Sequence, residues 1–291
     1  MFAVTSEVVP PRSADPASVE VQARGLVGYA DAVNLTDNPT ASAHMSSVAA
    51  ASMVTAAGLE PVVQLACRDR NRIGLTSDLL GAWALGARNV LCLTGDPPGA
   101  GDHPDAKQVF DLTVLELVAL ADGLRREGRL LSGAVIEPPP RYFIGVADVP
   151  LRDGYDFGRL ESKADAGADF VQTQIVFDAE RFEVWADQAR SRGILERMFV
   201  LAGVAVPRGA RGARYMRDHL PGVAVPESLI RHLEEAGPDA EEEACRLMVE
   251  IIARLKAIQG IAGIHVMGLG QMELVQRVIK GAGLVPRPPV L

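Results

Sequence analysis

Three polar residues stand in or at the end of short apolar runs, where their side chains could do chemistry: Glu7, Asp96 and Gln174. Burial raises the pKa of a carboxyl group, so a poorly solvated Glu7 would suit a general acid near neutral pH. Asp96 follows Gly95, which lets a ligand approach the backbone, and its carboxylate could hydrogen-bond a polar ring. A buried amide such as that of Gln174 needs partners, and a flat heterocycle with amide edges would supply them.

These and the other polar segments also have structural interpretations that spacing alone does not remove. Glu7 could pair with a Lys or Arg, and the segment around Asp96 could be a surface turn. Residues 36–39 most commonly form a turn that caps the following helix, and the arginines of residues 67–72 could bind phosphate or pair with nearby aspartates. His265 is more often a satisfied core residue than a catalyst, and the five histidines show no metal-binding spacing.

Short β-rich runs alternate with helical stretches along the chain. Helical spacing or capping predicts helices over Ile73–Leu85, Asp111–Arg126, Arg181–Arg192 and Pro238–Ile258, with Asp178 as a helix cap. The strand-like runs are continuously apolar, which is typical of parallel strands buried on both faces. The predicted strands are Ala3–Val8, Ala32–Leu35, Pro61–Ala66, Asn89–Leu93, Tyr142–Val146, Asp169–Gln174, Met198–Ala202 and Gly263–Met267.

Eight strand–helix repeats without an obvious break favour the α/β class, as a single parallel (β/α)8 TIM barrel and one catalytic domain over residues 1–291. An open doubly wound sheet is the weaker alternative, because no GxGxxG motif follows the first strand. In a barrel the chemistry belongs at the carboxyl ends of the strands. We therefore expect Glu7, Asp96 and Gln174 to point into one cavity there.

The composition argues against several classes of protein. Hydrophobic residues make up 48%, enough for a sizeable core, while a net charge of −8 argues against nucleic acid and anionic membranes as partners. Cys67, Cys92 and Cys245 form no CxxC pair, so we expect reduced thiols. The chain shows neither a secretion signal nor an apolar stretch of membrane-spanning length. We therefore expect a soluble cytoplasmic protein without a metal, and we leave homo-oligomerisation open.

The order of six motifs resembles that of the methylenetetrahydrofolate reductase family over nearly the whole chain. The resemblance implies a barrel oxidoreductase acting on CH–NH donors in one-carbon metabolism and methionine biosynthesis. Such an enzyme binds FAD, takes hydride from NADH or NADPH and reduces 5,10-methylenetetrahydrofolate to 5-methyltetrahydrofolate. The motifs are Glu7-Val8-Val9-Pro10-Pro11, Cys67-Arg68-Asp69-Arg70-Asn71, Leu93-Thr94-Gly95-Asp96-Pro97, Ala166-Gly167-Ala168-Asp169-Phe170, Gln172-Thr173-Gln174 and Gly263-Ile264-His265.

The same resemblance implies a role for individual positions. Glu7 matches the catalytic proton donor, which helps the bridging carbon of the substrate to open to an iminium that accepts hydride. Asp96 matches a catalytic aspartate that contacts the flavin and the pterin, and Gln174 matches a glutamine that hydrogen-bonds the pterin. The implied cofactor-binding positions are Thr36, Gln64, Thr94, Gly95, Asp96, Asp156 and Lys163, and the further substrate-binding positions are Leu269 and Gln271.

Four positions depart from the family pattern. Gln64 stands where some relatives have a flavin-contacting histidine, Thr94 where some have an arginine, Ala210 where an aromatic residue stacks on folate, and Gln271 where an arginine occurs. The folate and catalytic positions are better kept than the flavin positions, so direct hydride transfer from NADH to the same substrate is an alternative. Another is a pterin-binding subunit that serves a methyltransferase partner, with residues 244–258 as an interaction surface.

Overall fold

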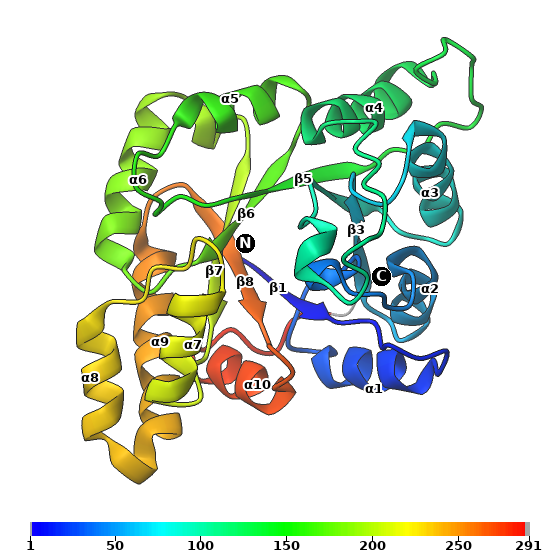
Figure 1. Cartoon of the computed structure of the whole chain (residues 1–291). Helices are drawn as coiled ribbons and strands as arrows, with labels where there is room; N and C mark the ends of the chain where they lie inside the picture. The colour runs from blue at the N-terminus through cyan, green and yellow to red at the C-terminus, as the bar shows by residue number, and fades with distance from the viewer. Residues whose placement is uncertain (1, 289–291) are drawn as a thin grey trace.

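Within residues 2–288, which this computed structural model describes, eight parallel strands close into a barrel in their order along the chain (Figure 1). Each strand pairs in parallel with the next, and the last closes the barrel by pairing with the first. The predicted TIM barrel is therefore confirmed, and the open sheet is excluded. The strands are β1 Ala3–Val8, β2 Ala32–Leu35, β3 Glu60–Ala66, β4 Asn89–Leu93, β5 Phe143–Asp148, β6 Phe170–Ile175, β7 Phe199–Ala205 and β8 Ile261–Met267.

Helices surround the barrel, and the connection from β7 to β8 holds several of them (Figure 1). Short 3-10 turns occur at Pro39–Ala41, Pro98–Ala100, Ile194–Glu196 and Gly237–Asp239. The helices are α1 Ala17–Leu26, α2 Ser47–Ala56, α3 Arg72–Ala84, α4 Val114–Glu127, α5 Phe157–Asp165, α6 Ala179–Ser191, α7 Ala210–His219, α8 Glu227–Glu235, α9 Ala240–Ala257 and α10 Met272–Gly281.

Several predicted boundaries shift by one to three residues, and strand pairing explains the largest shifts. β5 continues to Asp148 because that residue still pairs with Thr173, and β7 continues to Ala205 because it pairs with Met267. The helix predicted from Pro238 begins at Ala240, since the preceding residues form a 3-10 turn. A strand's end depends on its neighbour as well as on its own side chains, which a single run of sequence does not contain.

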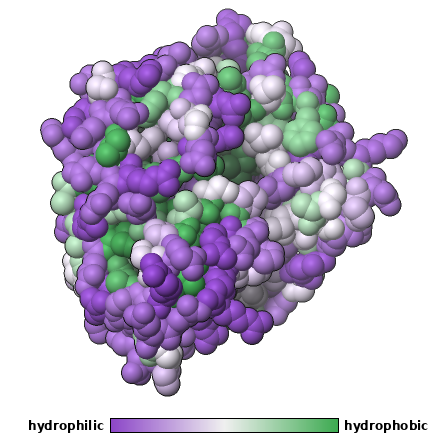
Figure 2. Space-filling model, turned by 60° about the vertical axis from the view of Figure 1, so that its left-hand side comes forward, coloured by the Kyte–Doolittle hydropathy of each residue, from purple (hydrophilic) through white to green (hydrophobic). Residues whose placement is uncertain are grey.

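Alternation along the strands divides the apolar side chains into two cores. Outward-facing residues pack against the helices in one large cluster, while Val62, Leu91, Phe170 and Leu201 pack inside the barrel. The face in Figure 2 is largely hydrophilic, with smaller hydrophobic patches between the polar residues. This two-layer burial is what makes parallel strands read as continuous apolar runs.

The barrel interior also holds two polar pairs. The amides of Asn34 and Gln172 exchange hydrogen bonds of 2.6 and 3.1 Å, and His265 Nδ1 lies 2.9 Å from the Thr5 hydroxyl. Burial lowers the pKa of His265 to about 4, so the imidazole is neutral near pH 7. His265 is thus a satisfied core residue in this structure, and the Gln172 amide finds its partner within the protein.

The helix caps follow the sequence pattern closely. Asp178 caps α6 by accepting a hydrogen bond from the Arg181 backbone N–H at 3.0 Å, as predicted. Asn71 caps α3 in the same way, and Thr113 and Glu116 form a reciprocal capping box at the start of α4. These caps fix where the helices begin after the loops that follow β3, β4 and β6.

The cysteine thiols and the hydrophobicity of the helices were both subjects of the sequence predictions. Cys67, Cys92 and Cys245 are free and buried, and burial raises the pKa of Cys67 to about 11. Among residues 2–288, no helix combines the length and the apolar composition that crossing a membrane would require.

Candidate active site

Glu7 lines a hollow of about 400 Å³ at the carboxyl ends of β1 and β8, together with Leu269 and Gln271. Ser18 and Gln22 of α1 form another part of its wall. Ala3 and Thr5 line the inside of the barrel, and Glu7 lies on the same face of β1 because side chains alternate along a strand. The structure thus brings together three of the predicted site residues.

Burial raises the pKa of the Glu7 carboxyl, and hydrogen bonds from the Leu269 and Gly268 backbone oppose this shift without cancelling it. Leu269 has a left-handed backbone, with a φ of 45°, and the residue is 42% exposed to solvent. A leucine in that conformation costs roughly 1–2 kcal/mol. The loop after β8 therefore places a strained, exposed apolar residue beside a carboxyl group that retains its proton more readily than usual, which is typical of a functional site.

A second group of predicted residues occupies the ends of β2, β3 and β4. Thr36 is buried, and its hydroxyl has no hydrogen-bond partner among the described residues. Gln64 is half-buried, whereas Thr94 and Asp96 are exposed in the loop after β4. Gly95 has a φ of 89°, which favours glycine. A buried hydroxyl without a partner is costly, so Thr36 is suited to meeting a polar group of a ligand.

The arginines that follow β3 are paired with aspartates of the same chain. Arg70 contacts both Asp37 and Asp78, and Arg72 binds Asp111 at 2.8 Å. Arg68 is almost fully buried and binds Asp69. Of the two interpretations that the sequence left open for this segment, the structure shows pairing with aspartates.

Asp156 and Lys163 lie together at a third place, a hollow of about 290 Å³ beside β5 and α5. The Lys163 ammonium donates to the Ala147 carbonyl at 2.7 Å and to Asp148 at 3.1 Å. Asp156 caps α5 by accepting a hydrogen bond from the Gly158 N–H at 2.9 Å. Both side chains therefore already have intramolecular partners.

Gln174 uses its amide to fix the end of β6. Its Nε2 donates to the Pro221 carbonyl at 3.0 Å, and its Oε1 accepts from the Ile175 N–H at 2.9 Å. None of the hollows described for residues 2–288 is lined by more than one of Glu7, Asp96 and Gln174. The three residues lie at one end of the barrel, and their meeting around one ligand stays a prediction.

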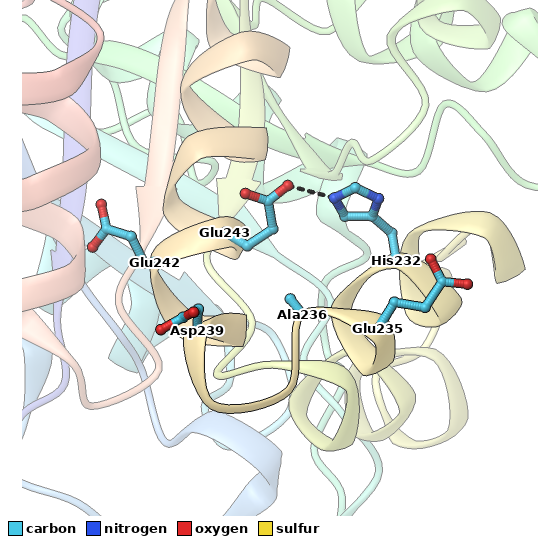
Figure 3. Close-up of a pocket in the computed structure, with 6 residues that line it drawn as sticks. All are labelled: His232, Glu235, Ala236, Asp239, Glu242 and Glu243. Carbon is cyan, nitrogen blue, oxygen red and sulfur yellow. Dashed lines mark hydrogen bonds and ion pairs between the residues drawn. The ribbon is translucent and has the colours of Figure 1, made fainter.

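A wide hollow of about 490 Å³ lies between α8 and α9 and contains none of the predicted site residues (Figure 3). Glu235, Asp239 and Glu242 make it acidic, and His232 contacts Glu243 across it. Within residues 2–288 no group of three or more His, Cys, Asp or Glu side chains is arranged to hold a metal ion.

Comparison with known proteins decides the family. The model of the methylenetetrahydrofolate reductase family matches residues 1–283. The chain belongs to this family. A Caenorhabditis elegans member, named a probable methylenetetrahydrofolate reductase (NADPH), is 26% identical over 249 residues, or 82% of this chain. The Escherichia coli 5,10-methylenetetrahydrofolate reductase is also 26% identical, and the match covers 79% of this chain and 72% of that enzyme.

The chain spans about a third of the length of the C. elegans relative, since the match covers 34% of that protein. Among solved structures, a Clostridium thermocellum protein described as binding two copies of 5-methyl-5,6,7,8-tetrahydrofolic acid has a TM-score of 0.65. It is 11% identical, and the match covers 98% of this chain and 95% of that one. At this identity the likeness supports the barrel fold.

Two positions that depart from the family pattern lie at the starts of helices. Gln271 precedes α10 and lines the hollow beside Glu7. Ala210 begins α7 and is half-buried.

The sequence did not indicate how the loops after β2, β3 and β4 are joined. The only signal was Arg68 itself, a charged residue directly after an apolar strand.

Proposed function

We propose that this chain is a methylenetetrahydrofolate reductase that uses NADH or NADPH to reduce 5,10-methylenetetrahydrofolate to 5-methyltetrahydrofolate. Family membership and the names of the C. elegans and E. coli relatives support this activity. The observation that carries it is Glu7, a half-buried residue whose carboxyl has a pKa raised by burial and faces a hollow at the catalytic end of the barrel.

Glu7 would act as the proton donor in this reaction. The methylene carbon of the substrate bridges two nitrogens, and breaking one carbon–nitrogen bond leaves an iminium on the other nitrogen. A proton from Glu7 neutralises the nitrogen that departs, and hydride then adds to the iminium carbon to form the methyl group. Glu7 recovers its proton from water, so each turnover consumes one reduced nicotinamide and one proton. A carboxyl that keeps its proton near neutral pH suits this role.

The residues at the ends of β2 to β4 fit a flavin in one respect, since the buried Thr36 hydroxyl has no partner among residues 2–288. In our proposal Thr36, Gln64, Thr94, Gly95 and Asp96 would contact FAD at these strand ends. Asp156 and Lys163 would contact it beside β5. Bound FAD would supply a hydride carrier between the nicotinamide and the folate. On the substrate side, Asp96, Gln174, Leu269 and Gln271 would contact the pterin.

Direct transfer from NADH without flavin is the second candidate. Its structural support is that the Lys163 ammonium already donates to Asp148 and to the Ala147 carbonyl. Fewer of its N–H groups are therefore available to a flavin than the family pattern implies. A pterin-binding subunit with a methyltransferase partner has less support. Ala244, Met248, Ile252 and Leu255 of α9 are buried in the core rather than presented to a partner.

The test is an assay of the purified protein with NADH or NADPH and 5,10-methylenetetrahydrofolate, with and without FAD. We expect folate-dependent oxidation of the nucleotide and a flavin band in the absorption spectrum. A colourless but active preparation would select direct hydride transfer. Tight folate binding without turnover, with activity restored by an added partner, would select the subunit. No nucleotide oxidation under any of these conditions would overturn the proposal.

A further inference from the structure

Arg68 has a side chain that is 3% exposed, and its guanidinium lies beneath the loops at the carboxyl end of the barrel. Its Nε and Nη2 donate to the Asp69 carboxylate at 2.7 and 2.6 Å. Nη2 also donates to the Asn38 carbonyl at 3.2 Å, and Nη1 donates to the Asp96 carbonyl at 3.2 Å. A buried guanidinium needs partners for its N–H groups, and here they come from three different loops.

These three loops follow β2, β3 and β4, and they carry the second group of predicted site residues except Gln64, which lies within β3. Asn38 lies two residues after Thr36, and Asp96 follows Thr94 and Gly95. The planar guanidinium presents its donors in a rigid fork, so one side chain sets the separation of the loop after β2 from the loop after β4. The two bonds to main-chain carbonyls hold the backbone itself.

The aliphatic stem of Arg68 also contacts the loop after β4. A Cβ atom built on Gly95 would lie 2.9 Å from Arg68 Cβ and 3.1 Å from Ala66 Cβ, so glycine is required for the loop to pack this closely. The loop is therefore held by packing of the stem against Gly95 and by the bond from the guanidinium to the Asp96 carbonyl. Asp96 itself is exposed.

We propose that Arg68 is a positioning residue that sets Asp96 and the strand ends around Thr36 for the folate step. This inference rests on the proposed reductase function, in which Asp96 contacts the flavin and the substrate. Arg68 acts through the backbone of these loops and has no direct contact with the reacting groups. A displacement of about 1 Å in a catalytic group can cost on the order of 100-fold in rate.

Arg125 offers a matched control at the opposite end of the barrel. It also binds several partners: Asp122 at 2.8 Å, the Tyr142 and Gly167 carbonyls at 2.9 Å, and Asp169. Tyr142 and Asp169 directly precede β5 and β6, so this network lies at the amino ends of the strands. Arg68→Lys and Arg125→Lys keep the charge but lose the fork, because one ammonium cannot reproduce the guanidinium's several bonds.

The experiment compares Arg68→Lys, Arg68→Met and Arg125→Lys with the unmodified protein. We expect all three substitutions to lower the melting temperature. In both Arg68 variants kcat with 5,10-methylenetetrahydrofolate should fall by about 10- to 100-fold, with little change in KM for the nicotinamide nucleotide. Arg125→Lys should keep kcat within about twofold. Hydrogen exchange should become faster in residues 36–42 and 94–101 of the Arg68 variants alone.

Equal loss of stability in Arg68→Lys and Arg125→Lys, with kcat unchanged in both, would overturn the inference. Unchanged exchange in residues 36–42 and 94–101 would overturn it as well, and this readout does not depend on turnover. If the unmodified protein lacks reductase activity, the proposed function fails separately, and hydrogen exchange still decides whether Arg68 positions the loops. Recovery of kcat in Arg68→Lys but not in Arg68→Met would show that charge, rather than the fork, is what matters, which also contradicts the proposal.

Discussion

At the scale of single residues, the proposed chemistry depends on the environment of one carboxyl group. Glu7 lies on the inner face of β1, where desolvation raises the pKa of its carboxyl. Hydrogen bonds with the backbone of Gly268 and Leu269 limit this rise. Glu60 is a second carboxyl whose pKa is raised by burial, but it begins β3 at the amino end of the strands. Comparing variants of the two glutamates therefore separates the effect of a raised pKa on activity from the effect of position in the barrel.

Glu7→Gln should lower reductase activity by about 10²- to 10⁴-fold, which is the usual contribution of a general acid. Nicotinamide binding and the melting temperature should hold, because the amide has a similar shape and cannot ionise. Steady-state rates and a binding titration would measure this. Glu60→Gln is the control and should keep full activity. Near-normal turnover by Glu7→Gln would show that another group donates the proton.

The pH dependence follows from the direction of the same shift. An acid must be protonated to act, so in the unmodified enzyme kcat/KM should be highest below the raised pKa of Glu7 and should decline as pH rises through it. A rate profile that is flat on the alkaline side, at pH values where the fold is intact, would argue against Glu7 as the donor.

At the scale of elements, the loop after β4 shows how a strand end becomes part of a site. Gly95 has a left-handed backbone and lies against the Arg68 stem, whereas Gly99 in the same loop has no atom within 4 Å of a built Cβ. The close approach therefore concerns one glycine and one neighbouring strand. It is a contact between elements, and the loop's own composition does not show it.

Gly95→Ala should lower the free energy of unfolding by about 1–2 kcal/mol from the left-handed backbone alone. The contact of the new Cβ with Arg68 adds to this loss and displaces Asp96, so kcat should fall as well. Chemical denaturation and steady-state kinetics would measure both effects. Gly99→Ala should stay within about 0.5 kcal/mol of the unmodified protein. If both variants behave alike, the packing against Arg68 does not constrain the loop.

At the scale of the whole molecule, barrel closure buries polar groups that then depend on one another. β8 closes against β1, and this pairing sets His265 beside Thr5. Burial lowers the pKa of His265 to about 4 from an ordinary value of 6.5. Between these values an unfolded chain takes up a proton that the folded protein does not, so stability is lost as pH falls through this window.

His265→Gln should reduce the acid sensitivity of the fold. The shift in the His265 pKa corresponds to about 3 kcal/mol at 1.4 kcal/mol per unit, present above pH 6.5 and lost by pH 4. Glutamine can still hydrogen-bond Thr5 but does not titrate. Urea unfolding at several pH values should therefore show a smaller loss in the variant. As a control, His103 is exposed, and His103→Gln should retain the acid sensitivity of the unmodified protein. If the free energy of unfolding of His265→Gln falls with decreasing pH as steeply as that of the unmodified protein, His265 is not the source of the acid sensitivity.

The sequence by itself determined the architecture. Apolar runs bounded by turn residues gave β1, β2 and β4 their observed limits, and their alternation with helices predicted a closed barrel. It also predicted the Asp178 cap and the placement of polar residues at strand ends. These features could be read because strand and helix periodicities and caps depend on neighbours in sequence.

The tertiary structure alone decided which polar groups meet. Gln172 bonds with Asn34 across 138 positions, Gln174 with Pro221 across 47, and Arg68 with Asp96 across 28. Likewise, Glu7 acquires its electrostatic environment from the loop after β8, near the other end of the chain. Hydrogen bonds and desolvation act over a few ångströms in space, whereas the sequence records separation along the chain, and only folding relates the two.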